Sequence, residues 1–191
     1  MVFEYILKQE GINPLDVNIV QNIDFGSTAA AFSGGQGDFT IEFEPHATLL
    51  EQQGDGYVIA SLGEASGYVP YTAYCVRKGY LDEHKDIIQG FTNAIQKGLN
   101  YVNSHSAAEI SKVIAPQFTD TDETTLTTIV ERYKQQNTWK EDTLFNQESF
   151  NLLQDILEDA GELEHRVPYD QLVTTEFSET ALSQTKNSAT N

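Results

Sequence analysis

The sequence predicts an α/β fold, with one doubly wound unit at the start of the chain and mainly helices after it. The stretch from Asp16 to Pro45 holds two runs rich in β-branched and aromatic residues, Val17–Asn22 and Phe39–Phe43, on either side of small residues. This order is typical of a strand–helix–strand unit. A third run, Tyr57–Leu62, is nearly continuously apolar, as in strands buried on both faces of a sheet. Residues 1–62 are therefore predicted to alternate helix and strand.

Residues typical of helix ends predict where the helices of this unit lie. Ser27 or Thr28 can cap a short helix, because their side-chain oxygens accept hydrogen bonds from free backbone N–H groups. Pro45 fits the first turn of a helix, where its missing N–H costs nothing. Helices are expected over Met1–Glu10, Gly26–Gly34 and Pro45–Gln53.

After residue 62 the pattern changes from mixed to mainly helical. Gly63–Pro70 is polar and contains two glycines, and we expect a hinge or a crossover there. Tyr71–Arg77 is aromatic and β-branched, which favours one more strand. Apolar stripes at helical spacing and capping residues then predict helices over Leu81–Ser104 (one helix, or two with a break), Ser106–Ile114, Asp120–Gln136, Gln147–Ala160 and Tyr169–Leu182. The polar end, Ser183–Asn191, is predicted to be disordered.

Composition excludes several classes of function. The chain has 11 Lys+Arg against 29 Asp+Glu, a net charge of -18, which disfavours binding to nucleic acid or to anionic membranes. Its single cysteine, Cys75, excludes an internal disulfide, and the four histidines lack the spacing of a zinc site. No metal or cofactor is indicated. The start of the chain lacks a signal-peptide pattern, and no stretch reaches the ~18 apolar residues of a membrane span.

Two polar segments at predicted strand ends are the candidate site. Ligands of open parallel sheets bind beyond the carboxyl ends of the strands, which here are Asp24–Thr28 and Glu42–His46. The first segment could bind an anion at a helix start, or Ser27 or Thr28 could simply cap the helix. The second could accept hydrogen bonds from a ligand through Glu42 and Glu44, or it could be a solvated strand edge.

Several stretches, taken in order, resemble one family of proteins. They are FGSTAAAFSGGQGDFTIEFEPHATLLEQQGDGYVIASLG, YTAYCVRKGYLDEHKDIIQGFTNAIQKGLNYVNSH, TIVERYKQQNTW and LLQDILEDAGEL. They are similar to the periplasmic-type solute-binding proteins of ABC importers, in the branch that binds sulfonates, taurine, nitrate or pyrimidine precursors of thiamine. The resemblance covers residues 1–181 and rests on the order of the elements rather than on one strict motif.

The resemblance implies two α/β lobes that close on a small polar solute, with residues 1–62 in the second lobe, 63–70 as the hinge between lobes, and 71–182 returning to the first lobe with C-terminal helices. It implies ligand contacts from Phe25, Gly26, Ser27 and Thr28, and from Glu42, Phe43 and Glu44. Serine and threonine hydroxyls suit an acceptor group, whereas Glu44 suits a donor, so a zwitterion or an aminopyrimidine fits better than bare nitrate.

The same resemblance implies an extracytoplasmic, membrane-associated protein that is not an enzyme and that delivers its solute to an ABC permease and ATPase. Family members carry a signal peptide and most of the first lobe ahead of the position of Met1, so the chain is expected to be truncated at its N-terminus. A sheet that lacks its first strand would expose an edge, from which we expect self-association. The alternatives are an enzyme similar to pyrimidine-precursor synthases and a truncated remnant that binds nothing.

Overall fold

The computed structural model of the protein describes residues 1–188, with side chains described as far as residue 184. The chain forms two compact units. One contains Ile6–Ala65 and Ser106–Thr138, and is called the central unit below. The other contains Met1–Tyr5, Ser66–His105 and the chain from Trp139 onward, and is called the outer unit. The boundary after Ala65 lies within the predicted hinge Gly63–Pro70, whose motion stays a prediction.

Both units are helical, so the prediction of an α/β, doubly wound fold like that of periplasmic binding proteins is wrong. No residue from 1 to 188 belongs to a β-strand. The four expected strands are irregular connecting segments instead: Val17–Asn22, Phe39–Phe43, Tyr57–Leu62 (which runs into a helix at Leu62) and Tyr71–Arg77.

The reason is that β-propensity expresses packing against neighbouring strands rather than a preference of the backbone alone. These segments find no partner strand within the described chain, and their large side chains face solvent. Phe39 is 76% exposed, Tyr57 86% and Tyr71 79%. The expected sheet edge is therefore not formed either.

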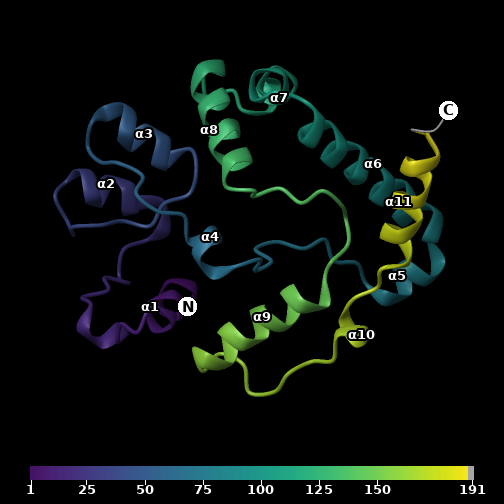
Figure 1. Ribbon diagram of the computed structural model, residues 1–191, viewed down its shortest axis with the longest axis horizontal. Coiled ribbons are helices and arrows are strands. Elements are labelled where there is room, and N and C mark those ends of the chain that lie inside the picture. The colour runs from purple at the N-terminus through teal and green to yellow at the C-terminus, as the bar shows by residue number, and fades with distance from the viewer. Residues whose placement is uncertain (189–191) are drawn as a thin grey trace. The chain divides into compact units, whose positions relative to one another are not determined.

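The central unit has its core in a helical hairpin. Helix α7 (Ala107–Ile114) packs against α8 (Glu123–Gln135), and Figure 1 shows the two side by side. The apolar side chains buried between and around them are Ala107, Ile110, Leu126, Ile129 and Val130. Burial of a Leu, Ile or Val side chain stabilises the fold by roughly 1.5–3 kcal/mol.

Side-chain caps fix where these two helices begin. Ser106 and Glu109 form a complete capping box at the start of α7. The Asp122 carboxylate accepts hydrogen bonds from the backbone N–H groups of Thr124 and Thr125 at the start of α8. These contacts satisfy N–H groups that would otherwise lack partners.

The other helices of the central unit are short. They are α2 (Thr28–Ser33), α3 (His46–Gln53), most of α4 (Leu62–Ser66) and the last part of α1 (Val2–Gln9), with 3₁₀ turns at Pro14–Asp16, Phe25–Ser27 and Ala115–Gln117. Helix α3 ends at Gly54, whose φ of 79° lies in the left-handed region that glycine enters most easily. Leu50 of α3 is buried, and α3 contacts both α2 and α8.

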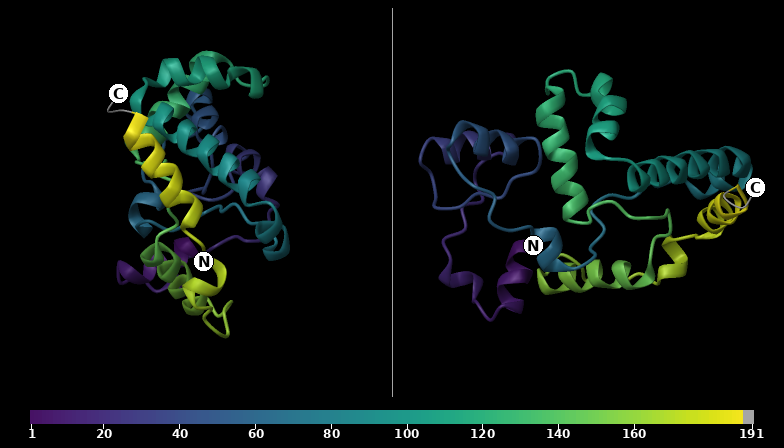
Figure 2. Two further views of the ribbon diagram at one scale, coloured as in Figure 1. Left: turned by 90° about the vertical axis from the view of Figure 1, so that its right-hand side faces the viewer. Right: turned by 45° about the horizontal axis from the view of Figure 1, so that its top comes forward.

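The outer unit contains α5 (Lys78–Glu83), α6 (Lys85–Ser104), α9 (Gln147–Asp159), α10 (Tyr169–Leu172) and α11 (Glu176–Ser188). Figures 1 and 2 show α11 lying along α6, where Phe177 and Ala181 are buried. The expected helix Leu81–Ser104 is two helices that meet at His84. Helix α11 continues through Ser188, and the remainder of the segment predicted to be disordered, residues 189–191, lies outside the described residues.

A buried amide organises the loop that follows α8. The Gln96 side chain is 2% exposed. Its Oε1 accepts a hydrogen bond from the backbone N–H of Thr143 (3.0 Å), and its Nε2 donates to the carbonyl of Glu141 (3.1 Å). A single side chain of α6 therefore holds an irregular segment in place.

Candidate functional site

The two segments predicted to form the site do meet. The rings of Phe25 and Phe43 lie edge to face, with their centroids 5.3 Å apart and their planes at 65°. Both rings are accessible, Phe25 at 54% and Phe43 at 42% exposure. Edge-to-face pairs of this kind are favourable because the positive edge of one ring meets the negative face of the other. The contact joins the polar turn before α2 to the segment that leads into α3.

The turn Phe25–Ser27 is held by Asp24 rather than by the two predicted capping residues. The Asp24 carboxylate accepts a hydrogen bond from the backbone N–H of Gly26 at 3.3 Å. The Thr28 hydroxyl donates to the carbonyl of Phe25 at 2.9 Å, and Ser27 makes no side-chain cap. This turn therefore presents an exposed ring and a serine whose hydroxyl is not used as a cap.

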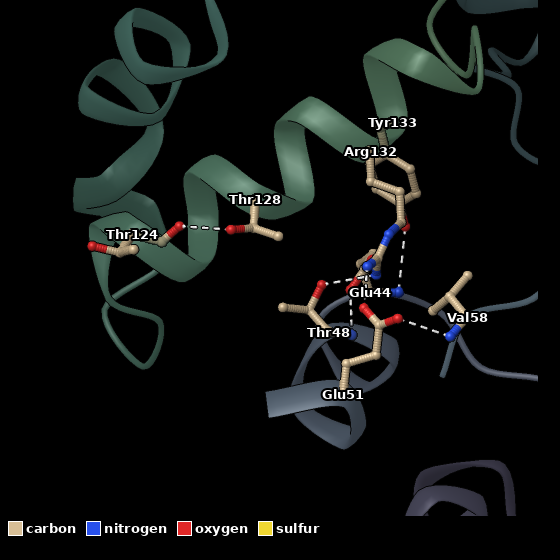
Figure 3. Close-up of polar contacts among 8 residues, drawn as sticks. All are labelled: Glu44, Thr48, Glu51, Val58, Thr124, Thr128, Arg132 and Tyr133. Atoms are coloured by element: carbon tan, nitrogen blue, oxygen red, sulfur yellow. Dashed lines mark hydrogen bonds and ion pairs between the residues drawn. The ribbon is translucent and has the colours of Figure 1, made fainter. Parts of the chain in front are cut away.

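The Glu44 carboxylate is buried, and each of its two oxygens accepts a hydrogen bond from a protein group. Its side chain is 5% exposed. Oε1 accepts a hydrogen bond from Nη1 of Arg132 at 2.5 Å, and Oε2 accepts one from the backbone N–H of Thr48 at 3.0 Å. The Tyr133 hydroxyl lies 3.4 Å from the backbone N–H of Glu44, which donates to it. Figure 3 shows these groups converging between α3 and α8.

Arg132 links the two helices through three acceptors. Besides Glu44, its guanidinium donates to the Thr48 hydroxyl at 3.0 Å and to the Glu51 carboxylate. Partial burial by itself disfavours the charged guanidinium, but the hydrogen bonds to Glu44 and Glu51 outweigh it and raise the pKa of Arg132. The backbone N–H of Val58, together with Arg132, lowers the pKa of Glu51 against the opposing effect of burial. These shifts favour the charged forms of Arg132 and Glu51.

Arg132, Thr48 and Glu51 were not among the residues predicted from sequence. One signal was available: Thr48 and Glu51 are three residues apart on a predicted helix, so they share a face. In a chain with 11 cationic residues against 29 acidic ones, an arginine beside the inward positions of α8 was a candidate partner for them.

Glu42 differs from Glu44 in lacking a cationic partner within hydrogen-bond range. Its side chain is 4% exposed. Oε1 accepts a hydrogen bond from the Thr40 hydroxyl at 2.8 Å. Oε2 is buried and has no hydrogen-bond partner among the described residues, and Nδ1 of His46 lies 3.8 Å from it. A buried carboxylate oxygen without a partner is costly, so it needs an explanation.

A hollow of about 430 Å³ lies in the outer unit, and none of the predicted site residues lines it. It is lined by Gln147, Asn151, Gln154, Arg166, Val167, Pro168, Tyr169 and Asp170. Its one cation, Arg166, is already held by Asp155 and Glu158, whose carboxylates accept its hydrogen bonds.

The described residues contain no group of His, Cys, Asp and Glu side chains arranged to hold a metal ion. Within the same part of the chain, no helix combines the length and the apolar character required to cross a bilayer.

Comparison with known proteins shows the family to which the chain belongs. Residues 1–108 match the NMT1/THI5-like family, and the chain therefore belongs to that family. It is also 42% identical over 185 residues to a Bacillus subtilis (strain 168) protein named "putative binding protein YtlA". That match covers 96% of this chain and 55% of the relative, so the chain spans little more than half of the relative's length. No solved structure gives a significant match.

The matched region includes both predicted segments, Phe25–Thr28 and Glu42–Glu44, but not the hollow of the outer unit, which begins at Gln147. We therefore regard the Phe25–Phe43 region as the stronger candidate. The name of the relative describes a binding protein.

Proposed function

We propose that this protein binds a small polar solute at the Phe25–Phe43 region and delivers it to the permease and ATPase of an ABC importer. The observation that carries the proposal is the meeting of the two predicted segments within the part of the chain that matches the family. The exposed rings of Phe25 and Phe43 offer an apolar surface. The neighbouring hydroxyls of Ser27 and Thr28 and the carboxylate of Glu42 offer polar groups that can orient a ligand, as binding sites of small molecules require.

The solute class follows from these groups. A sulfonate or carboxylate suits the hydroxyls, and an amine or ring N–H suits the carboxylates, so taurine-like zwitterions and aminopyrimidines are the first compounds to test. The relative's name supports binding rather than catalysis, and the extracytoplasmic side of the membrane is the location that fits a protein of this role.

The experiment is a thermal-shift panel of taurine, methanesulfonate, nitrate, bicarbonate and 4-aminopyrimidine with the full chain. A ligand that binds only the folded state raises the melting temperature with its concentration. At about 100 times the dissociation constant it adds roughly 2.7 kcal/mol to the stability. A concentration-dependent rise with one or more compounds supports the proposal, and a flat response to all five at millimolar concentration contradicts it.

Two variants distinguish binding at the predicted region from binding in the hollow of the outer unit. The variant Phe25→Ser removes an exposed ring of the proposed site, and Asn151→Ser changes the lining of the hollow. Loss of the shift in Phe25→Ser alone supports the proposed location. Loss in Asn151→Ser alone moves the site to the outer unit.

A further inference from the structure

The hollow of the outer unit has two walls that side-chain contacts tie together. One wall is α9, and the other is the segment that turns back after α9 toward α10 (Figure 1). The backbone N–H of Val167 donates to Oε1 of Gln154 at 2.7 Å, and Arg166 donates to Asp155 and Glu158 of α9. The hollow is therefore formed before any ligand arrives, which lowers the ordering cost of binding.

Three carboxamides line this hollow from α9. Gln147, Asn151 and Gln154 are spaced so that they share one face of the helix. Gln154 is buried, at 6% exposure, and still forms part of the lining. Because its Oε1 accepts from the N–H of Val167, the other terminal atom is the donor Nε2, which donates to no group of the described residues. A buried donor of this kind is costly unless water or a ligand accepts from it.

The charges around the hollow disfavour an anionic ligand. Arg166 uses Nε and Nη2 on Asp155 and Glu158, and its Nη1 has no partner in the described chain. Asp170 adds a third carboxylate beside the one guanidinium, so further negative charge would be repelled. A cation gains little either, because Arg166 already neutralises two of the carboxylates and an exposed ion pair with Asp170 contributes little.

We infer that this hollow binds a neutral polyhydroxylated compound, a sugar or a polyol. A hydroxyl group donates and accepts at one atom, so neighbouring hydroxyls match neighbouring carboxamides, each of which offers both functions. Nε2 of Gln154 and Nη1 of Arg166 supply further donors, and Val167 and Pro168 supply apolar surface for the C–H groups of the ligand. The volume of about 430 Å³ lies within the usual range of ligand sites, roughly 300–1,000 Å³.

This site goes beyond the proposed function and does not depend on it. The hollow lies in the outer unit and outside the residues that match the family, whereas the Phe25–Phe43 region lies in the central unit and within them.

The test is a titration of the ¹⁵N-labelled full chain with glucose, maltose and myo-inositol, followed by NMR of the side-chain amide signals. At least one compound should shift the signals of Asn151 and Gln154 saturably at millimolar concentration. Asn151→Ala removes one carboxamide of the hollow and should weaken binding about fivefold, as expected for one lost hydrogen bond. The matched control is Gln171→Ala, at an exposed position of α10 that does not line the hollow, and it should leave the affinity unchanged.

A second variant tests the buried donor itself. Gln154→Glu keeps an oxygen that accepts from the N–H of Val167 and replaces Nε2 by a second oxygen. Because the donor is lost and a negative charge is added beside the ligand, binding should weaken more than in Asn151→Ala. If Gln154→Glu fails to fold, the comparison of Asn151→Ala with Gln171→Ala decides the outcome.

Three results overturn the inference. The first is that none of the three compounds shifts the carboxamide signals of the hollow. The second is that Asn151→Ala binds as tightly as the unmodified chain. The third is that methanesulfonate or propylamine shifts these signals while no sugar or polyol does, which would show a charged ligand instead. None of these results decides the proposed function, whose thermal-shift panel measures binding of other compounds and whose variants locate it.

Discussion

Nη1 of Arg132 lies 2.5 Å from Oε1 of Glu44, although 88 positions separate the two residues in the chain. The pair joins α8 to the start of α3, and it therefore holds the segment that carries Phe43 and Glu42 against the helical hairpin. Neither side chain is well hydrated, at 18% exposure for Arg132 and 5% for Glu44.

Removing the cation should destabilise the central unit. Arg132→Met leaves the buried charge of Glu44 without its partner, and we expect a loss of about 2–3 kcal/mol, below the range for fully buried pairs because the arginine keeps some contact with water. Urea unfolding followed by circular dichroism measures the loss. The double variant Arg132→Met with Glu44→Gln should regain part of it, and equal losses in the single and double variants would contradict the ion-pair account.

The control for this prediction is Arg166→Met in the outer unit. Arg166 also contacts two carboxylates, but its side chain is 43% exposed. Ion pairs at the surface add little stability. Arg166→Met should therefore change the urea midpoint much less than Arg132→Met does.

The pH dependence of stability should include a contribution from Glu51. Its pKa is lowered in the folded chain, chiefly by the hydrogen bond from the backbone N–H of Val58, so the unfolded chain binds the proton more tightly. The stabilisation is therefore complete above the ordinary glutamate value of 4.5 and disappears as the pH falls below it, through the folded value. Denaturation midpoints between pH 7 and pH 3 should fall less steeply for Glu51→Gln than for the unmodified chain. If the midpoints of the two proteins fall equally steeply with pH, the predicted contribution of Glu51 is contradicted.

The helical part of the fold was largely predictable from local signals, and the rest was not. The capping box at Ser106 and the apolar stripe of α8 predicted two helices close to their observed positions. The prediction of strands was wrong because runs such as Tyr57–Leu62 need a neighbouring strand, which local sequence does not supply. The Arg132–Glu44 pair depends on α3 reaching α8 across the fold, so no local pattern could indicate it. The rings of Phe25 and Phe43 meet although the described residues form no sheet, and their role in binding stays a prediction.

The capping box gives a local test of the hairpin. Ser106→Ala removes the acceptor for the backbone N–H of Glu109 and should cost about 1 kcal/mol, the usual cost of losing an N-cap. Thr119→Ala, at an exposed position between α7 and α8, is the control and should change stability by less than about 0.5 kcal/mol. Equal effects of the two variants on the urea midpoint would show that the cap is not formed.

The buried side chain of Gln96 should contribute to the stability of the outer unit. Gln96→Leu keeps the volume similar but leaves the N–H of Thr143 and the carbonyl of Glu141 without their partner. Unsatisfied buried groups cost about 1–3 kcal/mol, so we expect a loss in that range. Hydrogen exchange should show faster exchange of the Thr143 amide. Unchanged exchange there would contradict the assigned role.

Self-association remains an expectation, now based on exposed apolar segments rather than on a sheet edge. Tyr57 is 86% and Ile59 74% exposed on one irregular segment. Light scattering should show association that rises with concentration, and the double variant Tyr57→Thr with Ile59→Thr should reduce it. A monomer at all concentrations for the unmodified chain would refute this prediction.

The most direct test of the central claim is hydrogen exchange of the full chain with and without the compound that gives the largest thermal shift. If the solute binds where we propose, amides within residues 24–28 and 39–46 exchange more slowly in its presence, while those within residues 147–170 do not change. Protection confined to residues 147–170, or no protection anywhere at saturating concentration, would contradict the account.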